Sequence, residues 1–181
     1  MKRGILFLII AAVGFGFTSC DKIDEIENFA VDNKFEKSVD LNIGANDPTT
    51  FSKDIVIEAS SDPDFQKNLS KISGYSVKKL TYRIASFTGD ASITGTGEFT
   101  FYSGGVALGA PVELGVIQFQ SFLESGEEKE IFISDNLKKE VQSKLLASNE
   151  ITVNFNGGVS GNPIDAEIIV AMEIEAQVKV N

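Results

Sequence analysis

Chemistry in this chain would have to come from carboxylates, hydroxyls and amines, because its 181 residues include no histidine. A Ser-His-Asp triad, a Cys-His pair and a histidine-ligated metal are therefore excluded. The single cysteine, Cys20, leaves no partner for an intramolecular disulfide and no basis for a cysteine-rich zinc site. We expect a protein that is not an enzyme and that carries no cofactor and no metal.

Two acidic residues near the C-terminus are the best remaining candidates for acid–base chemistry. Glu173 and Glu175 alternate with apolar residues, so they share one face of a predicted strand about 7 Å apart, which is within reach of the carboxylate spacing of glycosidases. Asp165 and Glu167 continue the same row of acids. Such a row is typical of a solvated strand face, and we interpret it as one.

Two serine motifs could be mistaken for a nucleophilic site. Residues 76–79 fit S-x-x-K and residues 134–136 fit S-D-N, the motifs of serine β-lactamases. The nucleophile of those enzymes lies at a helix N-terminus, whereas Ser76 opens a predicted strand. No K-T-G motif follows, and the 162 residues that remain after the first 19 are too few for that fold. We interpret the match as a coincidence.

Neither a calcium loop nor a phosphate loop is indicated. Acidic residues near Asn46-Asp47 and at Asp62 and Asp64 do not form a D-x-[DN]-x-[DN]-G loop. Gly95-Thr96-Gly97 lacks the third glycine and the strand–helix context of a phosphate loop. These glycines predict a turn or a bulge instead.

The N-terminus carries the most specific signal. Lys2 and Arg3 precede an apolar segment, residues 4–17, that is too short for a membrane span of about 20 residues. The segment ends in Phe17-Thr18-Ser19-Cys20, which resembles the lipobox of bacterial lipoproteins, with Phe at position 17 where Leu is usual. The resemblance implies cleavage before Cys20 and acylation of that residue by two or three chains such as palmitate, which anchor a protein durably.

Residues 20–32 are predicted to be the lipidated cysteine and an acidic tether, after a signal peptide over residues 1–19. Cys20-Asp21-Lys22 followed by Asp24-Glu25 is similar to a surface-export signal of some Gram-negative lineages, although the acids come one residue late. We expect a lipid-anchored protein of the cell envelope, in the outer membrane of a Gram-negative bacterium. The periplasmic and the surface face both stay open.

The remaining residues, 33–181, predict a single domain. After loss of Lys2 and Arg3, 14 basic residues face 26 acidic ones, a net charge of −12. An acidic body of this size repels phosphate backbones, so we expect no nucleic-acid partner. The 43% of hydrophobic residues, including fourteen Phe, fit a globular core.

Period-2 alternation of apolar residues predicts strands along most of the domain. The longest run, residues 164–180, has an apolar residue at every even position and would extend about 56 Å, so it must be bent, bulged, shared between two sheets or part of an elongated sheet. A parity change near Val116-Ile117 predicts a β-bulge. The other predicted strands cover residues 33–43, 51–59, 77–87, 93–101, 112–119 and 151–155.

Two short amphipathic helices are predicted between these strands. One starts at residues 61–64 and carries Phe65, Leu69 and Ile72 on one face, with Gly74 at its end. The other is capped at Ser134 and carries Leu137, Val141 and Leu145. Together the elements predict a mainly β protein, an antiparallel β-sandwich or open barrel with two helices. An α+β sheet with both helices on one face and an elongated tube are the alternatives.

We therefore predict a non-enzymatic interaction or structural module of the envelope, attached to the membrane through acyl chains on Cys20, with a possible protein partner in the envelope. The alternative is a carrier of a lipid or another apolar ligand in a cavity lined by strands and Phe side chains. The sequence does not name the ligand or the partner.

Overall fold

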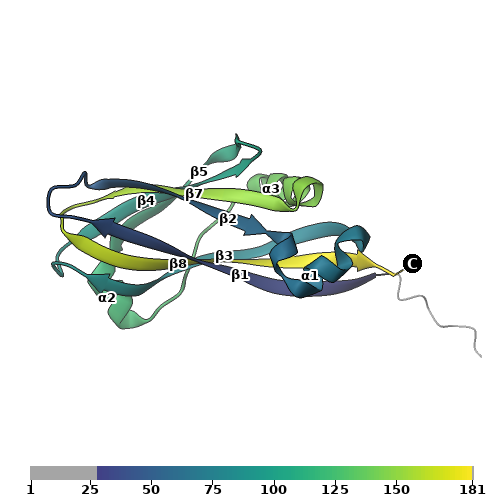
Figure 1. Cartoon of the computed structure of the whole chain (residues 1–181), viewed down its shortest axis with the longest axis horizontal. Coiled ribbons are helices and arrows are strands. Elements are labelled where there is room, and N and C mark those ends of the chain that lie inside the picture. Colours follow the sequence, from purple (N-terminus) through teal and green to yellow (C-terminus); the bar gives the residue numbers. More distant parts are fainter. Residues whose placement is uncertain (1–27, 181) are drawn as a thin grey trace, which may run out of the picture.

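The computed structural model describes residues 28–180, which form a sandwich of two antiparallel four-stranded sheets and not a closed barrel. The first sheet has the strand order β1-β8-β3-β6 and the second has β2-β7-β4-β5 (Figure 1). The predicted fold class is confirmed. The strands are β1 (Asn28–Ile43), β2 (Thr50–Glu58), β3 (Ile72–Thr88), β4 (Thr94–Ser103), β5 (Val106–Gln118), β6 (Lys129–Glu130), β7 (Glu150–Val159) and β8 (Ile164–Lys179).

Strand β8 lies inside the first sheet, between β1 and β3. It pairs with β1 without a break from Asn28–Lys179 to Ile43–Ile164. The same strand pairs with β3, where register shifts next to Ser73, Lys78 and Ala85 interrupt the ladder. The long C-terminal run is thus accommodated by an elongated sheet, and the bulges fall on its neighbour.

Burial along β8 follows the predicted alternation. Its even positions from Ile164 to Val178 are buried, and its odd positions are less so, except Ala171, which is also buried. Val180 departs from the pattern, because it follows the strand and is half exposed. Strand β1 begins at Asn28, five residues earlier than expected, so the last five residues of the predicted tether form strand.

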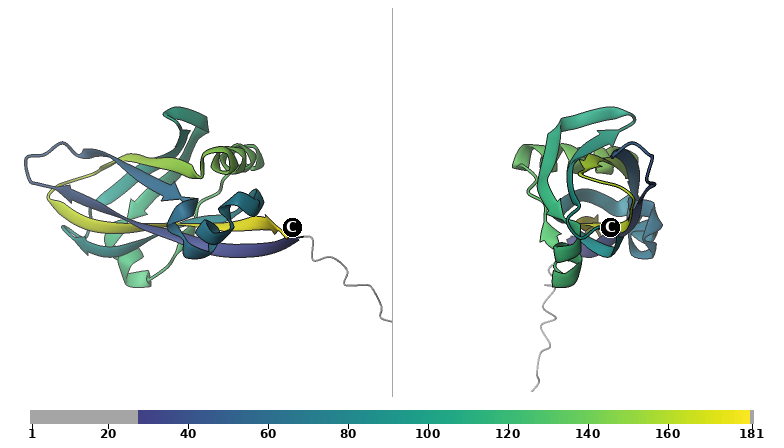
Figure 2. Two further views of the ribbon diagram at one scale, coloured as in Figure 1. Left: turned by 45° about the vertical axis from the view of Figure 1, so that its right-hand side comes forward. Right: turned by 90° about the vertical axis from the view of Figure 1, so that its left-hand side faces the viewer.

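Three α-helices occur in the described residues, one more than predicted: α1 (Pro63–Asn68), α2 (Phe119–Ser125) and α3 (Asp135–Ser148). Helix α3 has its expected cap, because the backbone N–H of Leu137 donates to Ser134 Oγ at 3.3 Å. It buries Leu137, Val141 and Leu145 as predicted. In the end-on view of Figure 2 the helices lie around the sandwich.

The predicted course of the first helix needs a correction at its end. Asp62 caps α1 by accepting from the N–H groups of Asp64 and Phe65, as expected. The α-helix ends at Asn68, a 3-10 turn follows over Leu69–Lys71, and Gly74 lies inside β3. Strand β3 begins at Ile72 because the neighbouring strand β8 extends to this level, where Ile72 pairs with Val178.

Helix α2 was missed because Phe119 continues the apolar parity of β5. We predicted a strand over residues 112–119 and no helix after it, whereas Phe119, Phe122 and Leu123 lie on one helical face at i, i+3 and i+4. The predicted bulge in β5 is present slightly earlier: Gly97 pairs with Gly115 and Glu98 with Glu113, so Leu114 is the additional residue.

Aromatic rings pack against one another in the core between the sheets, among many aliphatic side chains. Phe155 lies between Phe51 and Phe99, with ring centroids 4.8 and 4.9 Å away. Towards one end of the sandwich, Phe87 stacks on Phe119 at 5.3 Å. Phe99, Phe119 and Phe155 are at most 1% exposed. The many Phe side chains predicted for the core therefore pack against one another.

Glycines in β4 allow these rings to lie directly on the strand backbone. A Cβ atom at Gly95 would lie 2.7 Å from the ring of Phe119, and one at Gly97 would lie 2.5 Å from the ring of Phe155. Any side chain there would lift the ring from the sheet. The glycines of Gly95-Thr96-Gly97 are thus explained by core packing within a strand.

We expect Gly157→Ala to destabilise the domain by about 1–3 kcal/mol, the usual cost of overpacking a core. Its new methyl group would collide with the carbonyl oxygen of Thr96 on the neighbouring strand and lie 2.7 Å from the tip of the Phe51 ring. Urea unfolding measures the change. The control is Gly74→Ala, where a Cβ meets no atom within 4 Å. Equal unfolding midpoints for the two variants would contradict this account of the core.

Candidate functional site

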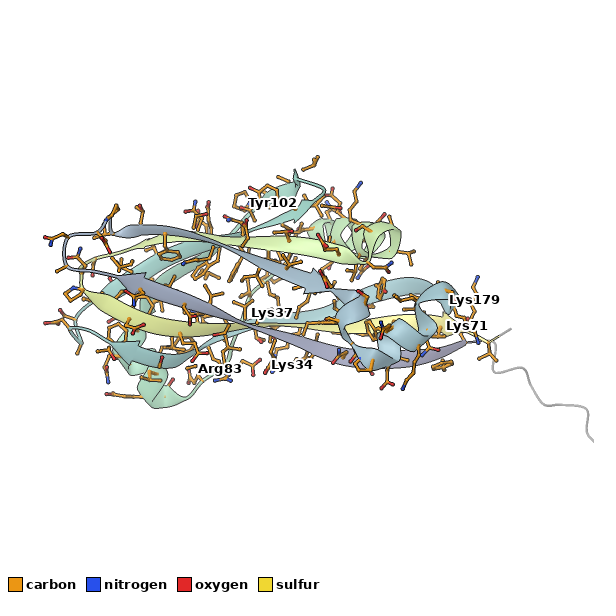
Figure 3. The ribbon with its side chains drawn as sticks, in the orientation of Figure 1. Lys34, Lys37, Lys71, Arg83, Tyr102 and Lys179 are labelled. Atoms are coloured by element: carbon orange, nitrogen blue, oxygen red, sulfur yellow. The ribbon has the colours of Figure 1, made fainter. Side chains whose placement is uncertain are left out.

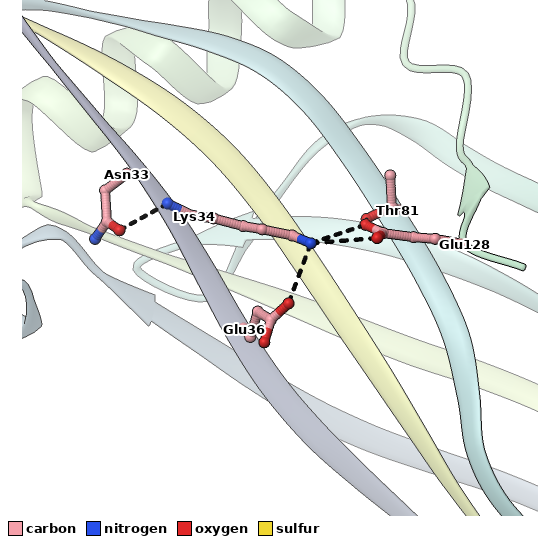
Figure 4. Close-up of polar contacts among 5 residues, drawn as sticks. All are labelled: Asn33, Lys34, Glu36, Thr81 and Glu128. Atoms are coloured by element: carbon pink, nitrogen blue, oxygen red, sulfur yellow. Dashed lines mark hydrogen bonds and ion pairs between the residues drawn. The ribbon is translucent and has the colours of Figure 1, made fainter. Parts of the chain in front are cut away.

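A cluster of polar side chains crosses the outer face of the first sheet. Lys34 of β1 places its Nζ atom 3.1 Å from Glu36 Oε1 and 3.1 Å from Glu128 Oε1. Thr81 of β3 is 1% exposed and donates its hydroxyl proton to Glu128. Figure 4 shows how these side chains meet above β8. The cluster thereby holds the segment between α2 and β6 against the sheet.

The charges in this cluster support one another. Hydrogen bonds from Thr81 and Lys34 lower the pKa of Glu128, against the opposing effect of partial burial. Hydrogen bonds to Glu128 and Glu36 raise the pKa of Lys34. Glu128 is therefore ionised and Lys34 protonated at neutral pH. Because each charged group already has a partner, the cluster acts as a clamp rather than as an acid or a base.

The candidate carboxylates Glu173 and Glu175 lie on the outer face of β8, as the alternation predicts. Glu175 Oε2 is 3.0 Å from Lys78 Nζ, and Glu175 Oε1 accepts from Gln177 at 2.7 Å. The hydrogen bond from Lys78 lowers the pKa of Glu175. Neither glutamate lines any of the hollows described below. In Figure 3, Lys34 and Arg83 lie on this same sheet.

The other motifs are placed separately and serve local structure. Ser76 lies inside β3, whereas Ser134 caps α3. Asp62 caps α1, and Asp47 Oδ2 accepts from the backbone N–H of Gly44 at 2.8 Å. Residues 28–180 contain no group of three or more Asp, Glu, His or Cys side chains placed to hold a metal ion.

The predicted lipidation site, Cys20, lies outside the described residues, as does most of the predicted tether. Among the helices of residues 28–180, none combines the length and the apolar character that crossing a membrane requires. The anchoring prediction therefore rests on the sequence motif.

Several hollows lie at the surface of the sandwich. One of about 570 Å³ lies on the second sheet over Gly97, Gly115 and Gly157. Another of about 540 Å³ lies between β5 and α3, beside Phe132, a side chain 84% exposed. A third, of about 500 Å³, lies between β5, α2 and residues 127–130. The carrier hypothesis, which needs an apolar interior cavity, stays a prediction without support from the packed phenylalanines of the core.

Sequence reasoning did not single out the residues of the polar cluster. Lys34 and Glu128 are 94 positions apart in the chain, and no local pattern links them. Thr81 is a polar residue at an outward position of the predicted strand over residues 77–87, where exposure to solvent is expected. It is buried because the segment that contains Glu128 covers it.

Comparisons with known proteins identify no family. No protein-family model matches the chain, and no curated protein matches it. The chain is similar in structure to Desmodium yellow mottle tymovirus, with a TM-score of 0.42, 9% identity and coverage of 85% of this chain and 90% of that one. An empty head of turnip yellow mosaic virus is similar with a TM-score of 0.39 and 11% identity, and the match covers 99% of this chain and 92% of that one. Tobacco necrosis virus is similar with a TM-score of 0.33 and 12% identity, and the match covers 82% of this chain and 98% of that one. Likenesses this weak carry no functional argument.

The stabilisation that Glu128 provides should depend on pH. Because its pKa is lower in the folded protein than the value of about 4.3 usual for glutamate, this contribution is complete above that pH and is lost as the pH falls through the lowered pKa. Glu128→Gln should cost at most about 1 kcal/mol at pH 7 and should lose less stability than the native protein between pH 5 and 3.

Urea unfolding across this pH range tests the expectation, with Glu140→Gln on the exposed side of α3 as the matched control. Native protein and Glu128→Gln that lose stability in parallel on acidification would show that the clamp contributes nothing.

Proposed function

We propose that this protein is a membrane-anchored envelope lipoprotein that acts as a non-enzymatic interaction or structural module. The observation that carries the proposal is the sequence Phe17-Thr18-Ser19-Cys20 at the end of a short apolar leader, with Cys20 as the only cysteine of the chain. Cleavage before Cys20 and acylation of its thiol and amino group would attach the domain to the outer membrane of a Gram-negative bacterium.

The arrangement of the first and last strands is compatible with such an anchor. Asn28 pairs with Lys179, so β1 begins at the end of the sandwich where β8 finishes (Figure 1). The eight peptide links from Cys20 to Asn28 can span at most about 28 Å. The 16 residues of β1 then extend about 50 Å away from that end. An acylated Cys20 would thus hold one end of the sandwich near the membrane and leave the opposite end free.

Side chains at the end nearest the proposed anchor suit a lipid surface. Lys71 and Lys179 lie there (Figure 3), in the register that pairs Ile72 with Val178. Phe29 is 40% exposed at the start of β1. Lysines beside a membrane are attracted to anionic headgroups by about 1 kcal/mol each, and an exposed aromatic ring suits the interfacial region.

The polar groups of the domain favour a binding or structural role over catalysis. Glu175 and Glu128, the two glutamates of residues 28–180 with lowered pKa values, are each held by a lysine and a further hydrogen bond. An acid or base catalyst needs a pKa near the working pH and room for a substrate. These two glutamates have their pKa values shifted away from neutrality and their hydrogen-bonding capacity already in use.

Replacement of Cys20 by serine tests the proposal. We expect the native protein expressed in a Gram-negative host to incorporate labelled palmitate and to fractionate with membranes. Cys20→Ser should lose the label completely, retain its leader and migrate as a larger species. Ser19→Ala, which keeps a small residue before the cysteine, is the control and should behave as the native protein. A Cys20→Ser protein that is processed and stays membrane-bound would contradict the anchor.

A further inference from the structure

One surface pocket combines an apolar floor, the side chain of a largely buried tyrosine and an acidic rim. It has a volume of about 500 Å³, within the range of ligand sites. It lies at the side of the sandwich where the edge strands β5 and β6 are bridged by α2. We call it the α2 pocket; its lining residues used here are Tyr82, Ile117, Phe122, Glu127, Glu128 and Glu130.

Tyr82 is the residue that first suggests a ligand. The residue is only 2% exposed, yet it lines the α2 pocket, and its hydroxyl, which is not sealed from solvent, forms no hydrogen bond with another residue of the range 28–180. Its ring packs edge-on against Phe122, with centroids 5.3 Å apart, so the side chain is held in place. Burial raises its pKa, which keeps the phenol protonated and able to donate. No side-chain polar atom of residues 28–180 is both buried and without a hydrogen-bond partner, so this hydroxyl reaches solvent and is free to donate to a ligand in the pocket.

The rim determines the charge of that ligand. Glu127, Glu128 and Glu130 line the pocket against one basic residue, Lys129. Glu128 is engaged by Lys34 and Thr81, whereas Glu127 and Glu130 form no ion pair within residues 28–180. The body as a whole carries an excess of acidic residues. A cationic group is therefore attracted and an anionic one repelled.

We propose that the α2 pocket receives a lysine or arginine side chain from an extended segment of a partner protein. The aliphatic stem of that side chain would cover Ile117 and Phe122, and its cationic head would reach Glu127 and Glu130. A backbone carbonyl of the same segment would accept from the Tyr82 hydroxyl. Because β5 is an edge strand with β4 as its one neighbour in the sheet, its free edge also offers backbone groups to an extended chain.

Other occupants fit less well. Tyr82 pairs with Val170, nine residues along β8 from Lys179, so the pocket lies about 30 Å from the end of the sandwich nearest the proposed anchor. An acidic rim at that height does not suit anionic lipid headgroups. A second copy of this chain would bring a second acidic body. The inference rests on the proposed function in one respect: it identifies the kind of partner that the proposed interaction module would bind.

Binding of two peptides to the mature protein, purified in detergent, tests the inference. One is a nine-residue peptide of alternating threonine and lysine with blocked ends, and the other has every lysine acetylated. At low salt we expect the lysine peptide to bind at least tenfold more tightly by calorimetry and to weaken as salt is added. Glu127→Gln combined with Glu130→Gln should weaken binding at least fivefold, and Tyr82→Phe at least threefold.

Glu140→Gln combined with Glu124→Gln, two exposed carboxylates that do not line the pocket, is the matched control and should bind as the native protein does. Equal affinity for the two peptides, or native affinity in the Glu127 and Glu130 variant, would overturn the inference. The inference would also be overturned if the Glu127 and Glu130 variant bound lipid vesicles or copies of itself differently from the native protein while its affinity for the lysine peptide was unchanged. These measurements use purified protein, so the peptide can fail to bind even though Cys20 is acylated. Equally, the peptide can bind to a protein whose Cys20 is not acylated.

Discussion

The unbroken pairing of β1 with β8 determines the shape of this molecule. Every one of the 16 residues of β1 has a partner on β8, so the start of β1 and the end of β8 meet at one end of an elongated sheet. Strand β3 continues on the other side of β8 and takes up the mismatch in three bulges. Backbone hydrogen bonds along such a ladder are individually modest, but a register shift of one residue would move every buried side chain of β8 to the outer face.

The two sheets pack against each other through one hydrophobic core to which both contribute. Phe51, Phe99 and Phe155 of the second sheet contact one another in this core, and glycines of β4 and β7 let rings lie close to the backbone. This packing leaves the centre of the sandwich filled. The features that can meet another molecule are consequently on the outside: the charged outer face of the first sheet, the surface hollows, and the end of the sandwich from which β1 starts.

Much of the fold follows from local sequence patterns. Alternation along residues 164–180 predicted a buried face that the structure confirms up to Val178, and the serine at 134 predicted the start of α3. The patterns failed where tertiary contacts decide the outcome. Phe119 keeps the parity of a strand but starts α2, because its ring packs on Phe87 from the other sheet. Likewise, the clamp of Lys34 and Glu128 joins distant segments, and the exposure of the Tyr82 hydroxyl to a pocket depends on the position of α2.

In the proposed role, the sandwich is held to a membrane at the end where β1 begins, and the α2 pocket is directed away from the membrane. Mass spectrometry of the intact protein extracted from bacterial membranes tests this claim most directly. We expect a mass equal to residues 20–181 plus a diacylglyceryl group, with or without a third acyl chain. A chain that is found without acyl groups, or that starts at a residue other than Cys20, would contradict it.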